Sequence, residues 1–312
     1  MNKTSIYFTK ISAHKWSGSA VLCGHMRDQE DDPTFTRLMV VRENGSWGLF
    51  GDFQDIAYGL TVGLSKVVTG RIDLYALGRD GVLCIRLAPN DPVNIQIPVK
   101  DRAGYLEGIC LASDGVYVCG SQREIQRYAN NQWSMEDEGL FVPRTSGAAG
   151  PTLFALVETV PGTLLTVGSS GFAARRVNGG NWETLDVPTN MDLYCVMADA
   201  KGGAWIGGAG GTLLHLSPDA SHWKDFSNPE ISIKTFDSMA MYQGNVYVTA
   251  MNQLLSLSND GKLTAVEGPF LKDSEFHAVS ASNDRLWVTG DEHVYRYGPE
   301  GWEHLLCPDN AP

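Results

Sequence analysis

The hydrophobic and polar positions of this chain follow one unit that recurs along most of its length. Each unit has an apolar strand that ends in Gly or Ala, a short turn, a second strand and a polar stretch that usually contains Trp. Five copies are clear and two are looser. The clear copies lie at residues 115–133, 162–182, 202–223, 244–263 and 284–302, and the looser ones at 19–47 and 72–90.

The small residue after the first apolar strand of each copy measures the spacing of the units. These residues are Gly24, Gly78, Gly120, Gly168, Gly208, Ala250 and Gly290. The successive gaps between them are 54, 42, 48, 40, 42 and 40 residues. A period near this length, with several short strands in each unit, is typical of a β-propeller. The sequence therefore predicts an all-β fold, a seven-bladed β-propeller of four-stranded antiparallel blades.

The fifth unit shows how four strands fit into one period. Alternating apolar positions predict strands at residues 192–199, 203–208, 212–216 and 222–226. A Trp near the outer strand recurs from unit to unit, which is what packing requires, and we expect it to cover the edge of the adjacent blade. These residues are Trp47, Trp133, Trp182, Trp223 and Trp302.

The repeat favours one domain over residues 1–312, because each sheet can bury its faces only against its neighbours. The first and last units both look complete, so we expect no strand to be exchanged between the termini. The expected blades are residues 3–50, 58–98, 104–135, 152–187, 191–227, 235–267 and 275–307.

Two short segments resemble a known propeller motif. Residues 177–182 (VNGGNW) and 258–264 (SNDGKLT) are partial matches to the Asp-box pattern Ser-x-Asp-x-Gly-x-Thr-Trp. With the strand pairs, they make the chain similar to degenerate bacterial β-propeller repeat proteins of the photosystem II assembly-factor and Asp-box type. The resemblance covers most of the chain and implies the fold, and it carries over no catalytic residue.

Three segments break the period, at residues 25–36, 48–60 and 136–152. Long connections inside a compact domain are usually functional or disordered. Connections from strand two to strand three and from blade to blade emerge on the same face of a propeller. We therefore expect these three loops to share one face, where a rigid scaffold presents binding residues.

Charge limits the class of partner. The net charge is −12 and no Lys or Arg cluster is present, which argues against nucleic-acid binding. An acidic surface attracts basic partners. No apolar run has the length of a signal peptide or a membrane span, and the six cysteines form no Cys-x-x-Cys pair. We expect a cytoplasmic monomer with buried, reduced thiols and no membrane contact.

No motif for catalysis emerges. The chain has no nucleophile elbow, no zinc-protease helix motif and no phosphate-binding loop. The arginines on the expected loop face are scattered, at Arg27, Arg102, Arg123 and Arg144. No His, Cys or carboxylate set has ligand spacing. The sequence therefore predicts no catalytic residue, no cofactor and no metal.

These observations favour a non-catalytic protein-binding propeller, and a cytosolic immunity or inhibitor protein that neutralises a basic toxin or effector domain is one specific form of it. Two alternatives stay open: a glycosidase-like or lyase-like enzyme that acts on a sugar or small molecule at the channel mouth, and an assembly scaffold. The expected partner-binding residues are Asp28, Glu30, Asp31, Asp32, Asp52, Asp55, Tyr58, Glu136, Asp137, Glu138, Phe141, Asp192, Tyr194, Asp273, Glu275 and Phe276.

The basic-partner hypothesis makes a kinetic prediction. Replacing Asp28, Glu30, Asp31 and Asp32 by their amides should slow association with a basic protein partner and flatten the salt dependence of the rate, because charge steering is screened by salt. A salt series of association rates, measured on the wild type and the four-amide variant, checks this. Equal rates for the two proteins would remove residues 28–32 from the interface, and an acidic partner would refute the electrostatic argument.

Overall fold

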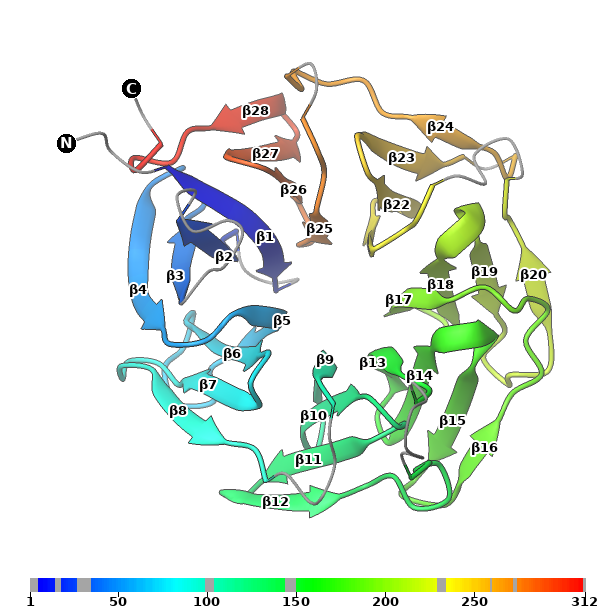
Figure 1. Ribbon diagram of the computed structural model, residues 1–312. Helices are drawn as coiled ribbons and strands as arrows, with labels where there is room; N and C mark the ends of the chain where they lie inside the picture. Colours follow the sequence, from blue (N-terminus) through cyan, green and yellow to red (C-terminus); the bar gives the residue numbers. More distant parts are fainter. Residues whose placement is uncertain are drawn as a thin grey trace. The chain divides into compact units, whose positions relative to one another are not determined.

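The computed structural model of the 312-residue chain describes residues 5–14, 18–26, 35–98, 104–143, 150–228, 234–258, 260–271 and 274–310. In these ranges the chain forms seven four-stranded antiparallel sheets, each built from four strands that are consecutive in sequence (Figure 1). The fold is a seven-bladed β-propeller, as the repeat predicts. The chain divides into two compact units, described here in turn.

Four of the blades belong mainly to the unit formed by residues 1–78, 82–95 and 238–312. The first two blades have the strands β1 (Ile6–Ala13), β2 (Ala20–Met26), β3 (Thr36–Val41) and β4 (Trp47–Phe53), and β5 (Ala57–Leu64), β6 (Ile72–Gly78), β7 (Val82–Arg86) and β8 (Val93–Gln96). The last two blades have β21 (Ser238–Tyr242), β22 (Asn245–Ala250), β23 (Gln253–Leu257) and β24 (Leu263–Ala265), and β25 (Ala278–Ala281), β26 (Leu286–Gly290), β27 (His293–Gly298) and β28 (Gly301–Leu305).

Three blades belong to the second unit, residues 79–81 and 96–237. Their strands are β9 (Leu106–Ala112), β10 (Gly115–Gly120), β11 (Ile125–Ala129), β12 (Gln132–Met135), β13 (Leu153–Val160), β14 (Thr163–Gly168), β15 (Ala173–Val177), β16 (Trp182–Thr184), β17 (Leu193–Ala198), β18 (Ala204–Gly208), β19 (Leu213–Leu216) and β20 (Trp223–Asp225). Single 3-10 turns, η2 (Ser169–Gly171) and η3 (Ala209–Gly211), join the second and third strands of two of these blades. No helix in the described ranges is long and apolar enough to cross a membrane.

The second strand of each blade forms the core. Every residue of β14 and of β26 is buried, and so are six of the seven residues of β2. The outer strands are more exposed, and in β16 and β20 two of the three residues are exposed while the Trp is half-buried. The four strands predicted for the fifth unit are confirmed, with ends that differ by at most one residue.

In most blades a steric constraint explains the Gly at the end of the second strand. This strand is the first of the two apolar strands in the repeated sequence unit. A Cβ atom at Gly120, Gly168, Gly208 or Gly290 would lie well inside 3.0 Å of the backbone carbonyl oxygen that precedes the inner strand of the same blade. Gly208 has an extended backbone with φ −166°. Gly is therefore needed at this position because a side chain would not fit, and not because the backbone is left-handed.

The first and last sheets contact each other inside the first unit. The Phe8 N–H donates to the Asp291 carbonyl at 2.7 Å, and the Ala13 N–H donates to the Ser280 hydroxyl at 2.9 Å. The Asn310 amide accepts from the Ile6 N–H at 2.6 Å and donates to the Ile6 carbonyl at 2.8 Å. No strand is exchanged between these two sheets in the described residues, as predicted, since β1 pairs only with β2.

One sequence-based expectation is wrong. Residues 48–60 are not a long connection, because Trp47–Phe53 form β4 and Ala57–Leu64 form β5. The irregular appearance has a local reason. The ladder between β3 and β4 shifts register between Leu38 and Met39, and Leu49 on this outer strand is 60% exposed. An apolar residue at an exposed position obscured the alternation.

The recurring Trp residues act partly as expected. The Trp182 Nε1–H donates to the Glu136 carbonyl of the preceding blade at 2.6 Å. The Trp302 ring meets the Phe270 ring at 4.9 Å, on the connection that leads into the last blade. Trp133 instead packs on Tyr128 of its own blade, with ring centroids 5.1 Å apart.

One matched pair of variants tests the steric role of the repeated Gly. Gly208→Ala should lower the free energy of unfolding by ~1–3 kcal/mol, because the new methyl group overlaps the Asp192 carbonyl oxygen. Ala250→Gly at the equivalent place in blade six should cost only about 0.5–1 kcal/mol through backbone entropy. Urea unfolding followed by circular dichroism measures both. Equal costs at the two positions would show that close approach does not select Gly here.

Candidate functional site

An open groove of about 670 Å³ lies at one end of the blade formed by β13–β16. Its walls come from η2 with Phe172, from the chain between Thr184 and Asp192, and from residues 150–151. These segments include the turn between the second and third strands and the connection to the next blade. The groove therefore lies at the end of the blade where the sequence predicts binding loops.

Arg123 supplies the positive charge of the groove. Its Cζ atom lies 3.7 Å from the centroid of the Phe172 ring, a cation–π contact. The Arg123 Nε atom is buried, and no described residue accepts a hydrogen bond from it. Burial lowers the pKa of Arg123, the direction expected for a cation that loses water without an adequate anionic partner. Arg123 lines the groove and is half-buried, so the part of its guanidinium that faces the groove can meet a ligand that brings an acceptor.

Asp192 fixes the opposite wall. Its Oδ1 accepts the Ser170 N–H at 2.7 Å, and its Oδ2 accepts the Tyr194 hydroxyl at 3.3 Å. Burial, and after it the Asp192 charge, raises the pKa of Tyr194. Ser170 has a φ of 57°, so the bond from its amide helps to hold an unfavourable backbone conformation. Two of the predicted partner-binding residues, Asp192 and Tyr194, therefore meet at the groove.

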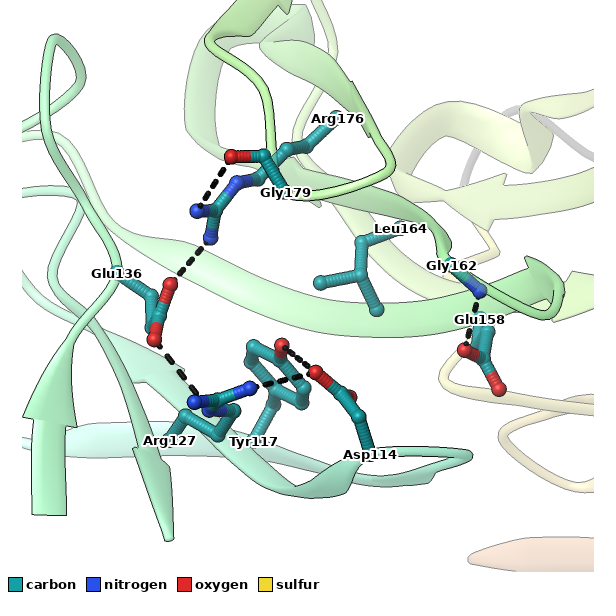
Figure 2. A pocket seen from close by; sticks show the side chains of 9 residues that line it. All are labelled: Asp114, Tyr117, Arg127, Glu136, Glu158, Gly162, Leu164, Arg176 and Gly179. Atoms are coloured by element: carbon teal, nitrogen blue, oxygen red, sulfur yellow. Dashed lines mark hydrogen bonds and ion pairs between the residues drawn. The ribbon is translucent and has the colours of Figure 1, made fainter. Parts of the chain in front are cut away.

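A second pocket, of about 280 Å³, lies at the opposite end of the same blades, beside the hairpins that contain Asp114 and Gly162 (Figure 2). Figure 2 shows a chain of ion pairs across it: the Arg127 Nη1 lies 2.6 Å from the Asp114 Oδ2, and the Arg127 Nε lies 3.3 Å from the Glu136 Oε1. The Arg176 Nη1 lies 2.5 Å from the Glu136 Oε2. Glu136 thus bridges two arginines from two blades.

The charged side chains in this pocket already have ion-pair or hydrogen-bond partners close by. Both oxygens of Glu158 accept hydrogen bonds from Ser113, and its Oε1 also accepts from the Gly162 N–H. The Tyr117 hydroxyl donates to Asp114 at 3.1 Å, and burial raises the pKa of Tyr117 to about 12. The pocket fastens adjacent blades together and leaves the groove as the stronger candidate for a binding site.

The acidic residues predicted after β12 differ in how far they are exposed. Glu136 belongs to the ion-pair chain, with a side chain that is 13% exposed. Asp137 is 4% exposed, and its carbonyl accepts the N–H of Phe141, which is half-buried. Glu138 is exposed. Of this segment, Glu138 is the residue whose position fits surface charge steering.

The partner-binding residues predicted in the first unit also differ in how far they are exposed. Asp52 pairs with Arg37, with 2.9 Å between the Asp52 Oδ1 and the Arg37 Nε. Tyr58 is half-buried, and Glu275 is exposed. Phe276 is 5% exposed and meets the Phe270 ring at 5.0 Å.

Three side chains were expected to face a partner and instead lie in the interior. Asp55 is 5% exposed, and its Oδ1 accepts the N–H of Ile56, so this carboxylate serves the connection between β4 and β5. Asp137 and Phe276 are buried as described above. For these three residues the expectation of surface contact is corrected, because turn geometry and core packing use their side chains. The other described residues stay predictions as partner contacts.

Five predicted partner-binding residues lie outside the described residues. They are Asp28, Glu30, Asp31, Asp32 and Asp273.

Three side chains that their spacing along the sequence does not single out lie close together in the structure. Glu275, His277 and Asp291 each offer a ligand atom, and these atoms lie within 4.8 Å of one another. No other such trio of His, Cys, Asp and Glu occurs in the part of the chain that the structure describes. Spacing along the sequence missed it because Asp291 reaches the other two through the β25–β26 hairpin.

The cysteines agree with the sequence-based interpretation. All six are free and buried. Burial raises the pKa of Cys23, Cys84 and Cys110 to about 12. A thiol with so high a pKa is a poor nucleophile near neutral pH.

Sequence reasoning also missed the importance of Arg123 and Arg176. Arg123 was one of four scattered arginines, and its partner in the groove is a ring 49 positions later, Phe172. Arg176 follows Arg175 on β15 and carries no motif. Its partner Glu136 belongs to the preceding blade, and no spacing along the sequence relates the two.

Comparison with known proteins supports the fold. No family model matches the chain, and no curated protein matches it in sequence. Among solved structures, YCF48 from Cyanidioschyzon merolae is similar with a TM-score of 0.65 and 14% identity, over 99% of this chain and 97% of that one. YCF48 bound to D1 peptide matches with a TM-score of 0.56 and 11% identity, over 74% and 76%.

A third similar structure is the extracellular domain of the hybrid two-component system BT4673 from B. thetaiotaomicron, with a TM-score of 0.66 and 15% identity. The match covers 97% of this chain and 38% of that one, so this chain spans well under half of that protein's length. At these identities the likeness establishes the fold alone. The resemblance to degenerate β-propeller repeats of the photosystem II assembly-factor type is confirmed at that level.

The ion-pair chain predicts a stability difference between two neighbouring glutamates. Glu136→Gln should destabilise the protein by ~1–3 kcal/mol, because two guanidinium groups lose a charged acceptor in a sheltered pocket. Glu138→Gln, at an exposed position, should change stability by less than about 0.5 kcal/mol. Urea unfolding of both variants provides the comparison. A cost at Glu136 no larger than at Glu138 would show that the bridge contributes nothing.

Proposed function

We propose that this chain is a non-catalytic, protein-binding propeller that takes an extended segment of a partner protein into the groove at η2. The observation that carries the proposal is the Arg123 guanidinium, which is stacked on Phe172 in the lining of the groove. A partner's carboxylate or backbone carbonyl group would accept hydrogen bonds from this group.

The lining of the groove suits a peptide better than a compact polar metabolite. It includes the apolar side chains of Leu185 and Val187, the hydroxyls of Ser169 and Thr189, and the charge of Arg123. Side chains of different kinds spaced along an open groove fit an extended peptide with alternating contacts. The volume of about 670 Å³ is also sufficient for several side chains.

The similar structures support the same class of function by analogy. One of them is YCF48 bound to D1 peptide, a propeller with a peptide ligand. Because the identity is 11%, neither that peptide nor its contacts are transferred to this chain. The analogy extends only to the use of a propeller as a platform for a protein segment.

The chemistry of the groove supports binding over catalysis. The Asp192 carboxylate already accepts hydrogen bonds from the Ser170 amide and the Tyr194 hydroxyl, so both of its oxygens are engaged in holding the wall of the groove. The described wall of the groove contains no His or Cys beside it. These features favour a fixed wall over a reacting group.

A more specific hypothesis is a cytoplasmic immunity or inhibitor protein for a basic toxin. Its support is the net charge of −12, which would speed the approach of a basic partner. The groove itself favours an acidic or carbonyl-rich contact at Arg123. A partner with overall positive charge and one acidic anchoring residue would suit both the net charge of the chain and the contact at Arg123. An assembly scaffold that binds such a partner belongs to the same class of function.

The groove is testable with displayed peptides. A random 12-residue peptide library is selected on the wild-type protein, and the Kd of each selected peptide is measured by fluorescence anisotropy. Arg123→Gln should weaken binding at least about tenfold, because a charge-assisted hydrogen bond in a sheltered site contributes ~1.5–3 kcal/mol.

Lys224→Gln is the matched control, because the Lys224 Nζ also stacks on a phenyl ring, 4.5 Å from the centroid of Phe226, on the outer strand β20. Its Kd values should equal those of the wild type. Selected peptides that bind equally well to Arg123→Gln would remove the groove from the proposal. A selection that yields no binder would contradict peptide binding itself.

A further inference from the structure

The start of the last blade holds a group of potential metal ligands outside the groove. Glu275 and His277 precede the inner strand β25, and Asp291 follows β26 directly. One ligand atom from each residue lies within 4.8 Å of the other two. The three therefore converge from two adjacent strands of one sheet.

Backbone contacts hold these residues in place. The His277 N–H donates to the Thr289 carbonyl at 2.9 Å, and the Glu275 N–H donates to the Asp291 Oδ2 at 3.3 Å. Gly290 permits this approach, because a Cβ atom there would overlap the Glu275 carbonyl oxygen. The site is thus built on the same close contact that closes each blade.

Without an ion, the His277 ring contacts the first strand of the chain. Its Nε2 atom lies 2.7 Å from the Tyr7 hydroxyl oxygen, a hydrogen bond that an ion bound at Nε2 would replace, and 3.5 Å from the Asp291 Oδ1. The longer distance exceeds that of a good hydrogen bond. It is close to the spacing of two ligand atoms around a metal with bonds of 2.0–2.2 Å.

Charge also favours a cation at this place. Two carboxylates, Glu275 and Asp291, adjoin a single imidazole, and no Lys or Arg of the described residues is recorded in an ion pair with either carboxylate. Glu275 is exposed, and the side chains of His277 and Asp291 are 21% and 26% exposed. Solvent can therefore deliver an ion and complete its coordination.

We propose that Glu275, His277 and Asp291 form a binding site for a divalent transition-metal ion, with Zn²⁺ as the best match. One imidazole nitrogen and two carboxylate oxygens are ligands that suit zinc and, less tightly, manganese. Calcium takes six to eight oxygen ligands and fits this set poorly.

The place of the site gives the ion a structural consequence. Asp291 also accepts, through its carbonyl, the N–H of Phe8 on β1. An ion that fixes Asp291 would hold the edge on which β1 rests. Because a ligand that binds only the native state stabilises it, bound zinc should strengthen the contact between the first and last sheets.

The test uses the full chain, free of any affinity tag and stripped with chelator. Zn²⁺ is titrated by calorimetry, and thermal unfolding is followed at increasing Zn²⁺ concentrations. We expect one Zn²⁺ per chain and a Tm that rises by a few degrees at saturation. Glu275→Gln, His277→Gln and Asp291→Asn should each weaken binding at least about tenfold.

The variants are chosen to keep the fold. Asn tolerates the positive φ of 49° at Asp291, and both Gln substitutions retain side-chain size or hydrogen bonding. Asp284→Asn, an exposed change in the same blade, is the control and should bind zinc as the wild type does. Unchanged binding in all three site variants would overturn the proposal, and so would wild type that shows no saturable binding of Zn²⁺.

A measurement on the wild type alone keeps the proposal falsifiable if a variant misfolds. Histidine modification by diethyl pyrocarbonate is mapped by mass spectrometry with and without saturating Zn²⁺. Zinc should slow the modification of His277 and leave the exposed His222 unaffected. Equal rates at His277 in the two conditions would exclude it as a ligand.

Discussion

The blades of this protein depend on one close backbone approach. At the end of the second strand, the chain passes so near to the carbonyl that precedes the inner strand that a methyl group does not fit at Gly120, Gly168, Gly208 or Gly290. This approach brings the turn after the second strand against the start of the first. Both candidate sites are built there: η2 and Asp192 form the groove wall, and Glu275 and Asp291 form the ligand pair.

The same constraint separates the two ends of each blade in function. At one end, turns and connections present backbone groups and mixed side chains, as in the groove with Arg123. At the other end, hairpins carry Asp114 and Gly162 and enclose an ion-pair chain through Glu136. Charges that satisfy one another stabilise the packing of neighbouring blades, whereas a charge without an acceptor is suited to binding. On our proposal, stability resides at one end and recognition at the other.

The sequence predicts the fold well because the repeat is a steric requirement. Periodic Gly and alternating apolar residues identified the strands of the fifth blade nearly to the residue. It predicts the sites poorly, because each depends on contacts between distant positions. Arg123 acquires its role from Phe172, and His277 from Asp291 and Tyr7. Acidic residues were also easier to find than to place: Asp55 and Asp137 are buried, since a carboxylate in a turn often binds nearby amides.

The contact between Ile6 and Asn310 joins residues that are 304 positions apart. A ribosome that adds about 5–20 residues per second needs roughly 15–60 s to make the chain between them. During that interval the sheet of β1–β4 exists without the sheet of β25–β28, and the apolar side chains of Ile6, Phe8 and Ile11, which belong to a shared core cluster with Trp287 and Val294, have no partner surface. Until then the sheet of β1–β4 can cover these side chains only with its own apolar residues, such as Leu22 and Val41 of the same cluster.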